Sequence, residues 1–261
     1  NNDGWTPETA KKPLVEAMKG PVAGDTVHAA AGVYADGTVA DGANSSTKCR
    51  VNVPAGVTLR GDDRDGTIIE GKAPSSPDKY GLGADAVRGV YLSANAKLCN
   101  LTVRKGYTKN GNLAAESYGG GVFGANRTTC FVEDCTIRDC YGSRSGGGHS
   151  VTFNRCRLLD NYGASTGAAG RGCSYYNTYI SGCKGNYRPM QDSTAFINCT
   201  YANDATDSEI VDPFQGANVT VANSVFLCDK VQLKSYVVSL KNVVFVKGGG
   251  VAAFPPVTSR F

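Results

Sequence analysis

An eight-residue phrase returns along most of this chain and constrains its fold more than any other feature. In NRCRLLDN, residues 154–161, apolar and polar side chains alternate as in a half-buried strand. The related phrases share a first polar slot, which holds Asn100, Asp134, Arg155, Asn177, Asn198, Asn223 and Asn242. These residues are separated by 34, 21, 22, 21, 25 and 19 positions. Such a period is too long for a meander of hairpins, and the phrases contain no 3.6-residue stripe that would indicate helices.

Two further slots of each phrase face the same side of a strand, because they are two positions apart. The second slots are Leu101, Cys135, Cys156, Thr178, Cys199, Ser224 and Val243, and the fourth slots are Val103, Ile137, Leu158, Ile180, Tyr201, Phe226 and Phe245. Each repeat then forms one turn of a coil, which we call a rung. A rung can bury this inner face only against the rungs before and after it, as in a solenoid. Asn in the first slot suits a hydrogen-bonded ladder and also a left-handed corner between strands.

Glycine clusters recur upstream of the phrases, at residues 119–121, 146–148 and 167–172. They suit a second corner at which backbones of neighbouring rungs stack closely. Short strands separated by Gly and Asn corners predict an all-β chain folded as a right-handed parallel β-helix.

Several stretches resemble a known family. They are GDTVHAAAGVY (24–34), VPAGVTLRGDDRDGTIIEG (53–71), and the pairs in which GGG-V precedes C-x-I-x-x-C and GGG-H precedes C-x-L-x-x-N. These stretches look like bacterial right-handed parallel β-helix proteins. That group includes pectate-lyase-like enzymes and glycine-rich surface proteins of the polymorphic outer-membrane repeat type. The resemblance covers nearly the whole chain and implies the fold, which hosts several activities.

We expect residues 1–261 to form one β-helix domain with a short N-terminal capping helix. Residues 6–20 fit the helix, with Pro13 at the first helical position. Residues 107–118 read as an insertion at a corner and explain the longest gap between phrases. At the other end, Pro255 and Pro256 either block pairing at the last strand edge or precede a further part of a longer chain.

Composition excludes several classes of function. The formal net charge of +4 comes without a Lys/Arg tract, so we expect no nucleic-acid partner. The sequence contains no run of eighteen apolar residues, so we expect no membrane span. With two histidines and no C-x-x-C motif, the sequence shows no recognisable metal-binding motif. We expect no cofactor and keep bound Ca²⁺ as an alternative. We also expect a monomer.

Ten cysteines lie in the chain, and three of them, Cys135, Cys156 and Cys199, fall in the inward second slot. Side chains stacked on neighbouring strands lie about 4.8 Å apart, farther than the Cβ atoms of a disulfide. We therefore expect these cysteines to be free thiols that act as small apolar core residues.

A candidate binding stripe follows the phrases. Tyr107, Tyr141 and Tyr162 come directly after the seventh slot, and Tyr187 lies three residues further along its rung. Stacked tyrosines would offer rings and hydroxyl groups to sugars. The alternative is a ladder of rings that only stabilises the corner.

Several Arg and Lys residues near this stripe are candidates for catalysis and for binding an acidic substrate. Arg171, Lys184 and Arg188 are candidate catalytic residues, and Arg144 is a candidate binding residue. The family resemblance implies that such cations neutralise a uronate carboxylate, which acidifies the adjacent C5 proton for abstraction. The alternative is a solvated basic face.

His149 in GGGHS resembles the Gly-His-Gly element of polygalacturonases, but Ser150 follows it and no paired-Asp motif accompanies it. We therefore read His149 as a corner or groove residue that contacts substrate.

Two functions follow. One is an extracellular carbohydrate-active β-helix protein, a lyase on an acidic polysaccharide. The other is a non-catalytic surface or adhesin-type β-helix that binds glycans or other cell-surface partners. Either function predicts an extracellular or cell-surface location.

Overall fold

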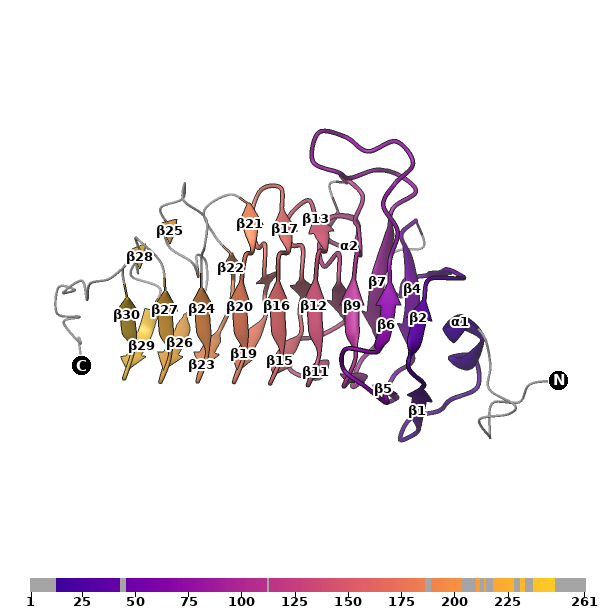
Figure 1. Ribbon diagram of the computed structural model, residues 1–261, viewed down its shortest axis with the longest axis horizontal. Coiled ribbons are helices and arrows are strands. Elements are labelled where there is room, and N and C mark those ends of the chain that lie inside the picture. The colour runs from indigo at the N-terminus through magenta and orange to yellow at the C-terminus, as the bar shows by residue number, and fades with distance from the viewer. Residues whose placement is uncertain are drawn as a thin grey trace.

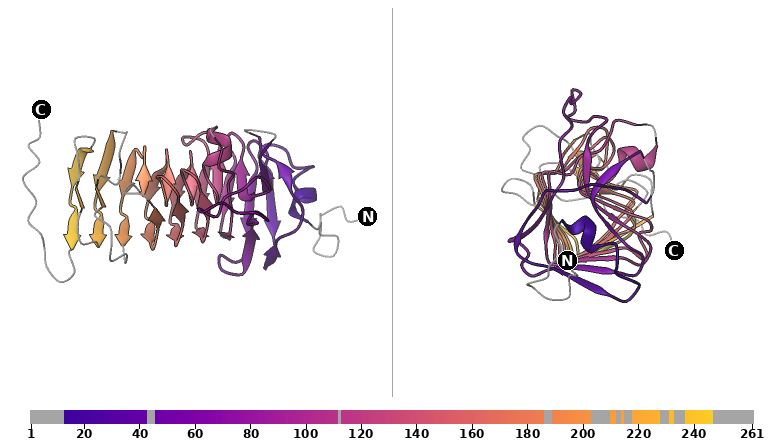
Figure 2. Two further views of the ribbon diagram at one scale, coloured as in Figure 1. Left: turned by 90° about the horizontal axis from the view of Figure 1, so that it is seen from above. Right: turned by 90° about the vertical axis from the view of Figure 1, so that its right-hand side faces the viewer.

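The computed structural model describes residues 13–42, 46–111, 113–185, 189–202, 210–211, 214, 218–227, 231–232 and 237–246. Within them the chain winds into a right-handed coil of short strands (Figure 1). Three long sheets form the sides of the coil, and Figure 2 shows the coil from above and along its length. The right-handed parallel β-helix predicted from the repeat is confirmed.

Sheets 1 and 2 each contain nine strands. Sheet 1 consists of β1 (Thr26–Ala29), β5 (Thr58–Gly61), β8 (Lys97–Cys99), β11 (Phe131–Glu133), β15 (Thr152–Asn154), β19 (Ser174–Tyr176), β23 (Ala195–Ile197), β26 (Val219–Ala222) and β29 (Val237–Lys241). Sheet 2 consists of β2 (Gly32–Tyr34), β6 (Thr67–Glu70), β9 (Thr102–Arg104), β12 (Thr136–Arg138), β16 (Arg157–Leu159), β20 (Tyr179–Ser181), β24 (Thr200–Ala202), β27 (Val225–Leu227) and β30 (Val244–Val246). The repeat phrases thus describe seven of the nine rungs, and the first two rungs lack the phrase.

Sheet 3 closes the coil. It consists of β3 (Val39–Ala40), β4 (Lys48–Val53), β7 (Val87–Leu92), β10 (Val122–Gly124), β14 (Gly148–His149), β18 (Gly170–Arg171) and β22 (Met190–Gln191). Its strands pair in parallel except β3, which runs antiparallel to β4. A small sheet 4, formed by β13 (Tyr141–Gly142), β17 (Tyr162–Gly163) and β21 (Lys184–Gly185), lies between sheets 2 and 3 along the chain. A further pair joins β25 (Ile210–Val211) to β28 (Val231–Gln232).

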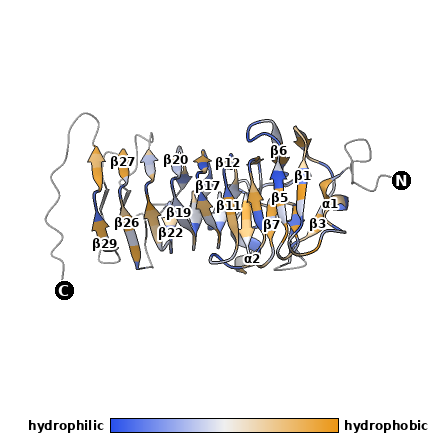
Figure 3. Ribbon diagram, turned by 90° about the horizontal axis from the view of Figure 1, so that it is seen from below, coloured by the Kyte–Doolittle hydropathy of each residue, from blue (hydrophilic) through white to orange (hydrophobic). Residues whose placement is uncertain are grey.

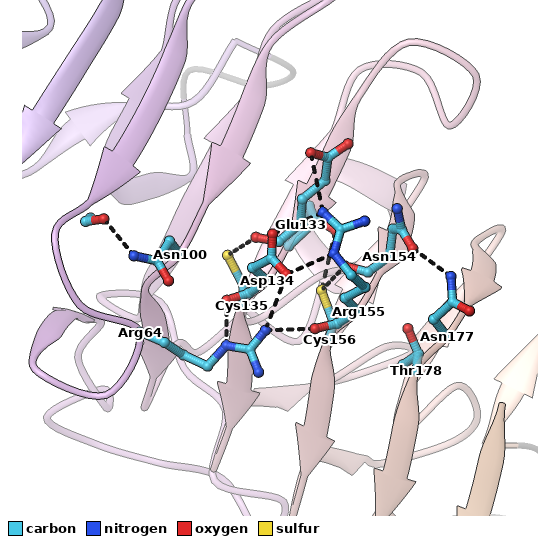
Figure 4. Close-up of polar contacts among 12 residues, drawn as sticks. Arg64, Asn100, Glu133, Asp134, Cys135, Asn154, Arg155, Cys156, Asn177 and Thr178 are labelled. Carbon is cyan, nitrogen blue, oxygen red and sulfur yellow. Dashed lines mark hydrogen bonds and ion pairs between the residues drawn. The ribbon is translucent and has the colours of Figure 1, made fainter. Parts of the chain in front are cut away.

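The corner between sheets 1 and 2 has the same conformation in seven rungs. All seven residues of the first polar slot have φ between 48° and 54°, the left-handed region that Asn tolerates. From Asn242 back to Asn177, each side-chain amide donates to the Asn of the preceding rung, over 3.0 to 3.3 Å. Asn177 then donates to Asn154 at 2.9 Å (Figure 4). The expected Asn ladder is therefore present, and we call this edge the ladder corner.

An ion pair replaces the ladder where two rungs lack Asn. Arg155 donates through Nε and Nη2 to the carboxylate of Asp134, over 2.8 and 2.9 Å. Arg64, from the turn at 62–66, donates to the backbone carbonyls of Asp134 and Arg155 (Figure 4). This side chain ties an early rung to two later ones, so the corner stays continuous across the interruption.

The core consists of the inward columns that the repeat predicts. Residues of the fourth slot pair in register across sheet 2, as Ile137, Leu158 and Ile180 do, and all three are fully buried. Figure 3 shows apolar segments in strands along the whole length of the coil. The nine described cysteines are buried and free, so the expectation of unpaired thiols in the inward column is confirmed.

The glycine corner also matches its prediction. A Cβ at Gly120 would lie 2.3 Å from the carbonyl oxygen of Tyr141, and one at Gly147 would lie 2.4 Å from that of Ala169. No larger residue fits, because neighbouring backbones stack directly against these positions.

Helix α1 (Leu14–Ala17) lies at the N-terminal end of the coil, where Leu14 and Met18 join the core (Figure 2). Pro13 is the N-cap and not the first helical residue as expected, because its ψ of 174° is extended. The helix therefore starts at Leu14. The helix ends at Ala17 rather than at residue 20, and residues 6–12 lie outside the described part.

The corner insertion contains a second helix, α2 (Ala114–Ser117). Tyr107 still bridges Tyr141, and Thr108 donates its amide proton to the Tyr141 carbonyl. The excursion from the rung therefore begins after Thr108, two residues later than the sequence pattern indicates.

Candidate functional site

Three of the four expected tyrosines form a column over sheet 4. The rings of Tyr107 and Tyr141 are parallel within 1°, with centroids 4.8 Å apart, and Tyr162 follows at 5.7 Å with a tilt of 43°. Lys184 is the next residue in register after Tyr162. Tyr187 and Arg188 lie outside the described residues.

The three tyrosines of the column are half-buried, and Lys184 beyond them is exposed. Burial raises the pKa of Tyr107 to about 12, and the ring faces of Tyr107 and Tyr141 pack on each other. Gly81 lies within van der Waals reach of the Tyr141 ring, because a Cβ there would lie 3.8 Å from Cδ1. A role of the column in substrate binding stays a prediction.

A second set of side chains lies on the outer face of sheet 3. Phe123, His149 and Arg171 are in register on β10, β14 and β18, and Tyr118 from the insertion packs over them. The His149 ring lies 4.7 Å from both the Tyr118 and the Phe123 rings. With Asp192 just after β22, we call these five residues the His149 cluster.

Arg171 is held in two ways. Its guanidinium carbon lies 4.8 Å from the centre of the Tyr118 ring, and its Nε donates to Asp192 at 2.8 Å. The remaining guanidinium N–H groups have no hydrogen-bond partner among the described residues. No contact among the described residues joins Arg171 to Lys184, which belongs to sheet 4.

His149 is locked in one tautomer. Its Nδ1 lies 3.1 Å from the carbonyl oxygen of Arg171, which only accepts, so Nδ1 carries the proton. Nε2 then accepts the hydroxyl proton of Ser150 over 3.2 Å. Burial lowers the pKa of His149 to about 3, against a smaller raising effect of the bond to Arg171. The imidazole is therefore neutral near pH 7.

Arg144 adds a second cation beside the cluster. Its Nη1 donates to the Tyr118 hydroxyl at 3.3 Å, and its guanidinium carbon lies 6.0 Å from that ring. The side chain is exposed and makes no ion pair with any described residue. Two guanidinium groups thus lie against one tyrosine.

A buried ion pair lies beside this cluster, next to Phe123 and the insertion. Arg88 pairs with Asp41, and both side chains are 0% exposed. Arg88 also donates to the backbone carbonyls of Ala115, Tyr118 and Gly119, which fixes the end of the insertion. Burial lowers the pKa of Arg88, while the Asp41 carboxylate opposes that shift.

The sequence pattern missed Tyr118, Phe123, Ser150 and Asp192. An alignment of Gly148-His149-Ser150 with Gly170-Arg171-Gly172 and Met190-Gln191-Asp192 would have found the last two, because these triplets occupy equivalent positions on sheet 3. Tyr118 carries no such signal, since it comes from the insertion.

Neither a cluster of metal ligands nor a membrane-spanning helix occurs among the described residues. No three His, Cys, Asp or Glu side chains of the described part converge as metal ligands would. Within the same part, no helix has the length and apolar character needed to cross a bilayer.

The sequence matches no protein-family model and no curated protein. Solved structures are similar in fold. A pectin methylesterase in complex with hexasaccharide VII is 10% identical, with 94% of this chain and 87% of that chain covered and a TM-score of 0.54. A mutant pectin methylesterase with hexasaccharide IV gives 10% identity, the same coverage and a TM-score of 0.52. A pectin methylesterase from Erwinia chrysanthemi is 13% identical over 89% of this chain and 78% of that chain, with a TM-score of 0.49.

At these identities the likeness concerns architecture alone. It confirms the right-handed parallel β-helix that the sequence motifs predict, whereas the expected bacterial source and repeat type stay predictions.

Proposed function

We propose that this chain is a carbohydrate-active β-helix protein that binds an acidic, pectin-like polysaccharide across the His149 cluster. The observation that carries the proposal is the pair of guanidinium groups, Arg144 and Arg171, against the ring of Tyr118. The proteins of the same fold named above act on pectin or were solved with hexasaccharides, which supports the substrate class. A polymer of this kind agrees with a secreted or cell-surface location.

The chemistry of the surface fits such a ligand. A guanidinium group binds a uronate carboxylate through two parallel N–H bonds, and an aromatic ring packs against the apolar face of a pyranose. The N–H groups of Arg171 other than Nε have no partner among the described residues, and Arg144 is exposed. The cluster therefore presents two guanidinium groups over aromatic rings that are themselves largely buried.

Elimination on the acidic polysaccharide, the reaction of a lyase, is the first candidate activity. Arg171 would neutralise the uronate carboxylate and so acidify the C5 proton, and Lys184 or Arg188 would assist its removal. Lys184 is exposed next to Tyr162 of the tyrosine column, 13 residues after Arg171 and on another sheet. As the C5 proton leaves, the C4–O bond to the neighbouring sugar would break, that oxygen would take up a proton, and the new C4=C5 bond would absorb ultraviolet light.

Ester hydrolysis is a second candidate, favoured by the hydrogen bond from Ser150 to His149 Nε2. Ser150 Oγ would attack the ester carbonyl while its proton moves to Nε2, and that proton would then pass to the leaving alcohol. Water would release the acid from the acyl-enzyme by the same route in reverse, and Ser150 would recover its proton. A base whose pKa is about 3 accepts a proton poorly, so we expect a slow reaction.

The binding proposal is tested by calorimetric titration with hexagalacturonate. We expect the wild type to bind and Arg171→Gln to bind about tenfold more weakly, because a charged hydrogen-bonded contact is lost. Arg157→Gln is the matched control, since Arg157 is exposed on sheet 2. Absence of binding, or equal affinity of the two variants, would contradict the proposal.

The reaction is tested on homogalacturonan with and without methyl esters. Ultraviolet absorbance that is lost in Lys184→Ala supports the lyase, and methanol release that is lost in Ser150→Ala supports the esterase. Binding accompanied by neither signal assigns the protein to the non-catalytic, adhesin-type alternative.

A further inference from the structure

A groove lies on the outer face of sheet 1, across one corner of the coil from the His149 cluster. Its volume is about 580 Å³, within the range of small-ligand sites. Strands β11, β15 and β19 provide its floor, and the turn at 125–130 provides one wall. The side chains that matter for its chemistry are Arg127, Thr128, Phe131, Thr152, Asn154 and Tyr176.

The wall is held in place before any ligand arrives. Asn126 accepts the amide and hydroxyl protons of Thr128 at 3.0 and 2.9 Å, which closes the turn. Thr152 on the floor donates its hydroxyl to the Arg127 carbonyl at 2.8 Å. The Arg127 side chain reaches on to the carbonyl of Asp192 at 3.4 Å. A preformed wall reduces the entropy lost on binding.

The floor combines hydroxyl, amide and aromatic groups. Ser174 and Thr194 share a hydrogen bond of 2.9 Å between their hydroxyl oxygens. Asn154 uses its side-chain oxygen for Asn177, which leaves the amide N–H groups free of partners in the described chain (Figure 4). The half-buried Tyr176 has no described partner for its hydroxyl. Hydroxyl-rich ligands find donors, acceptors and ring faces here.

The charge of the groove differs from that of the His149 cluster. Arg127 and Glu133 are the basic and acidic side chains among the lining residues, so they balance. Glu133 also lies 3.8 Å from Lys97 and 4.0 Å from Arg155. A polyanion would gain little net attraction and would meet the Glu133 carboxylate, whereas a neutral ligand meets no such penalty.

We infer that this groove binds a neutral oligosaccharide, with one pyranose ring packed on Tyr176 and hydroxyl groups bonded to the floor and to Arg127. The groove lies on the face of a sheet, where backbone groups are already paired, so an added peptide strand has no edge to extend. This site is distinct from the face proposed for the acidic polymer and does not depend on it.

The experiment is calorimetric titration with cellohexaose and with a β-1,4-linked galactohexaose. We expect at least one to bind the wild type, and Tyr176→Ala to weaken that binding about tenfold through loss of ring stacking. Tyr176→Phe keeps the ring and should lose less. Tyr179→Ala is the matched control, because Tyr179 is 41% exposed on the neighbouring sheet. Unchanged thermal unfolding of each variant shows that the fold is intact.

Three results would overturn the inference. They are no binding of either neutral hexaose, equal loss in Tyr176→Ala and Tyr179→Ala, or loss of neutral binding in Arg171→Gln. The last result would move the ligand to the His149 cluster. Failure here leaves hexagalacturonate binding untouched, so the two proposals are separable.

Discussion

The ladder corner and the outer face of sheet 3 obey opposite rules along the same coil. At the ladder corner, residues in seven rungs share one left-handed conformation, and Asn side chains bond from rung to rung. On sheet 3, equivalent positions hold Phe123, His149, Arg171 and Gln191, which differ in size, charge and polarity. Repetition satisfies stacked neighbours, whereas variation creates a surface that another molecule can recognise. The difference separates what holds the fold from what we propose it does.

The largest effect should come from the buried ion pair of Arg88 and Asp41. Arg88→Ala removes the guanidinium from a fully buried carboxylate and from three backbone carbonyls. We expect a loss of about 3–5 kcal/mol in the free energy of unfolding, measured with denaturant. Arg60→Ala, at an exposed arginine, should change it little. A loss in Arg88→Ala no larger than that of Arg60→Ala would show that the buried pair does not stabilise the fold.

Acid should weaken the outer face of sheet 3 through His149. The folded pKa of about 3 lies below the usual 6.5, so between these values the unfolded chain binds more protons. Stability is then present above pH 6.5 and is lost as the pH falls toward 3. We expect a loss of about 3 kcal/mol between pH 7 and pH 4 from this residue. His149→Gln should remove that part of the pH dependence, while His28→Gln at an exposed site should keep it. Equal curves of unfolding free energy against pH for the two variants would refute the role of His149.

The ladder corner should respond by a smaller amount. Asn198 bonds to Asn177 and Asn223 and has φ of 54°. Asn198→Ala loses both bonds and replaces Asn by a residue that tolerates the left-handed region less well, for a loss of about 2 kcal/mol. Asn198→Gly relieves the backbone term and should lose about half as much. Chemical denaturation would contradict this account if Gly were worse than Ala.

The smallest effect is expected at the corner between sheets 3 and 1. Ser150 has φ of 48°, and Gly172 and Asp192 occupy the equivalent left-handed positions. Ser150→Gly should raise the free energy of unfolding by about 0.5 kcal/mol, because glycine adopts this region freely. Ser165→Gly, at an exposed position without positive φ, should lower it slightly. The same sign for both variants would show that no strain resides at Ser150.

The sequence predicts the repeating parts well, since each rung meets the same neighbours. The inward columns, the left-handed first slot and the close glycine corner all follow from spacing alone. The parts that it misses break the period. Tyr118 and Arg171 are 53 residues apart and meet only because the insertion folds back over sheet 3. The groove depends on a turn at 125–130 that leans across later rungs, as the contact from Arg127 to Asp192 shows.

The central claim is that an acidic polysaccharide binds where the repeat is broken. It is tested most directly by amide chemical-shift mapping of isotope-labelled protein with hexagalacturonate. We predict that the shifted amides cluster at Tyr118, His149 and Arg171 on the outer face of sheet 3. Shifts confined to the ladder corner, at Asn177, Asn198 and Asn223, or no shifts at saturating hexagalacturonate, would contradict the account.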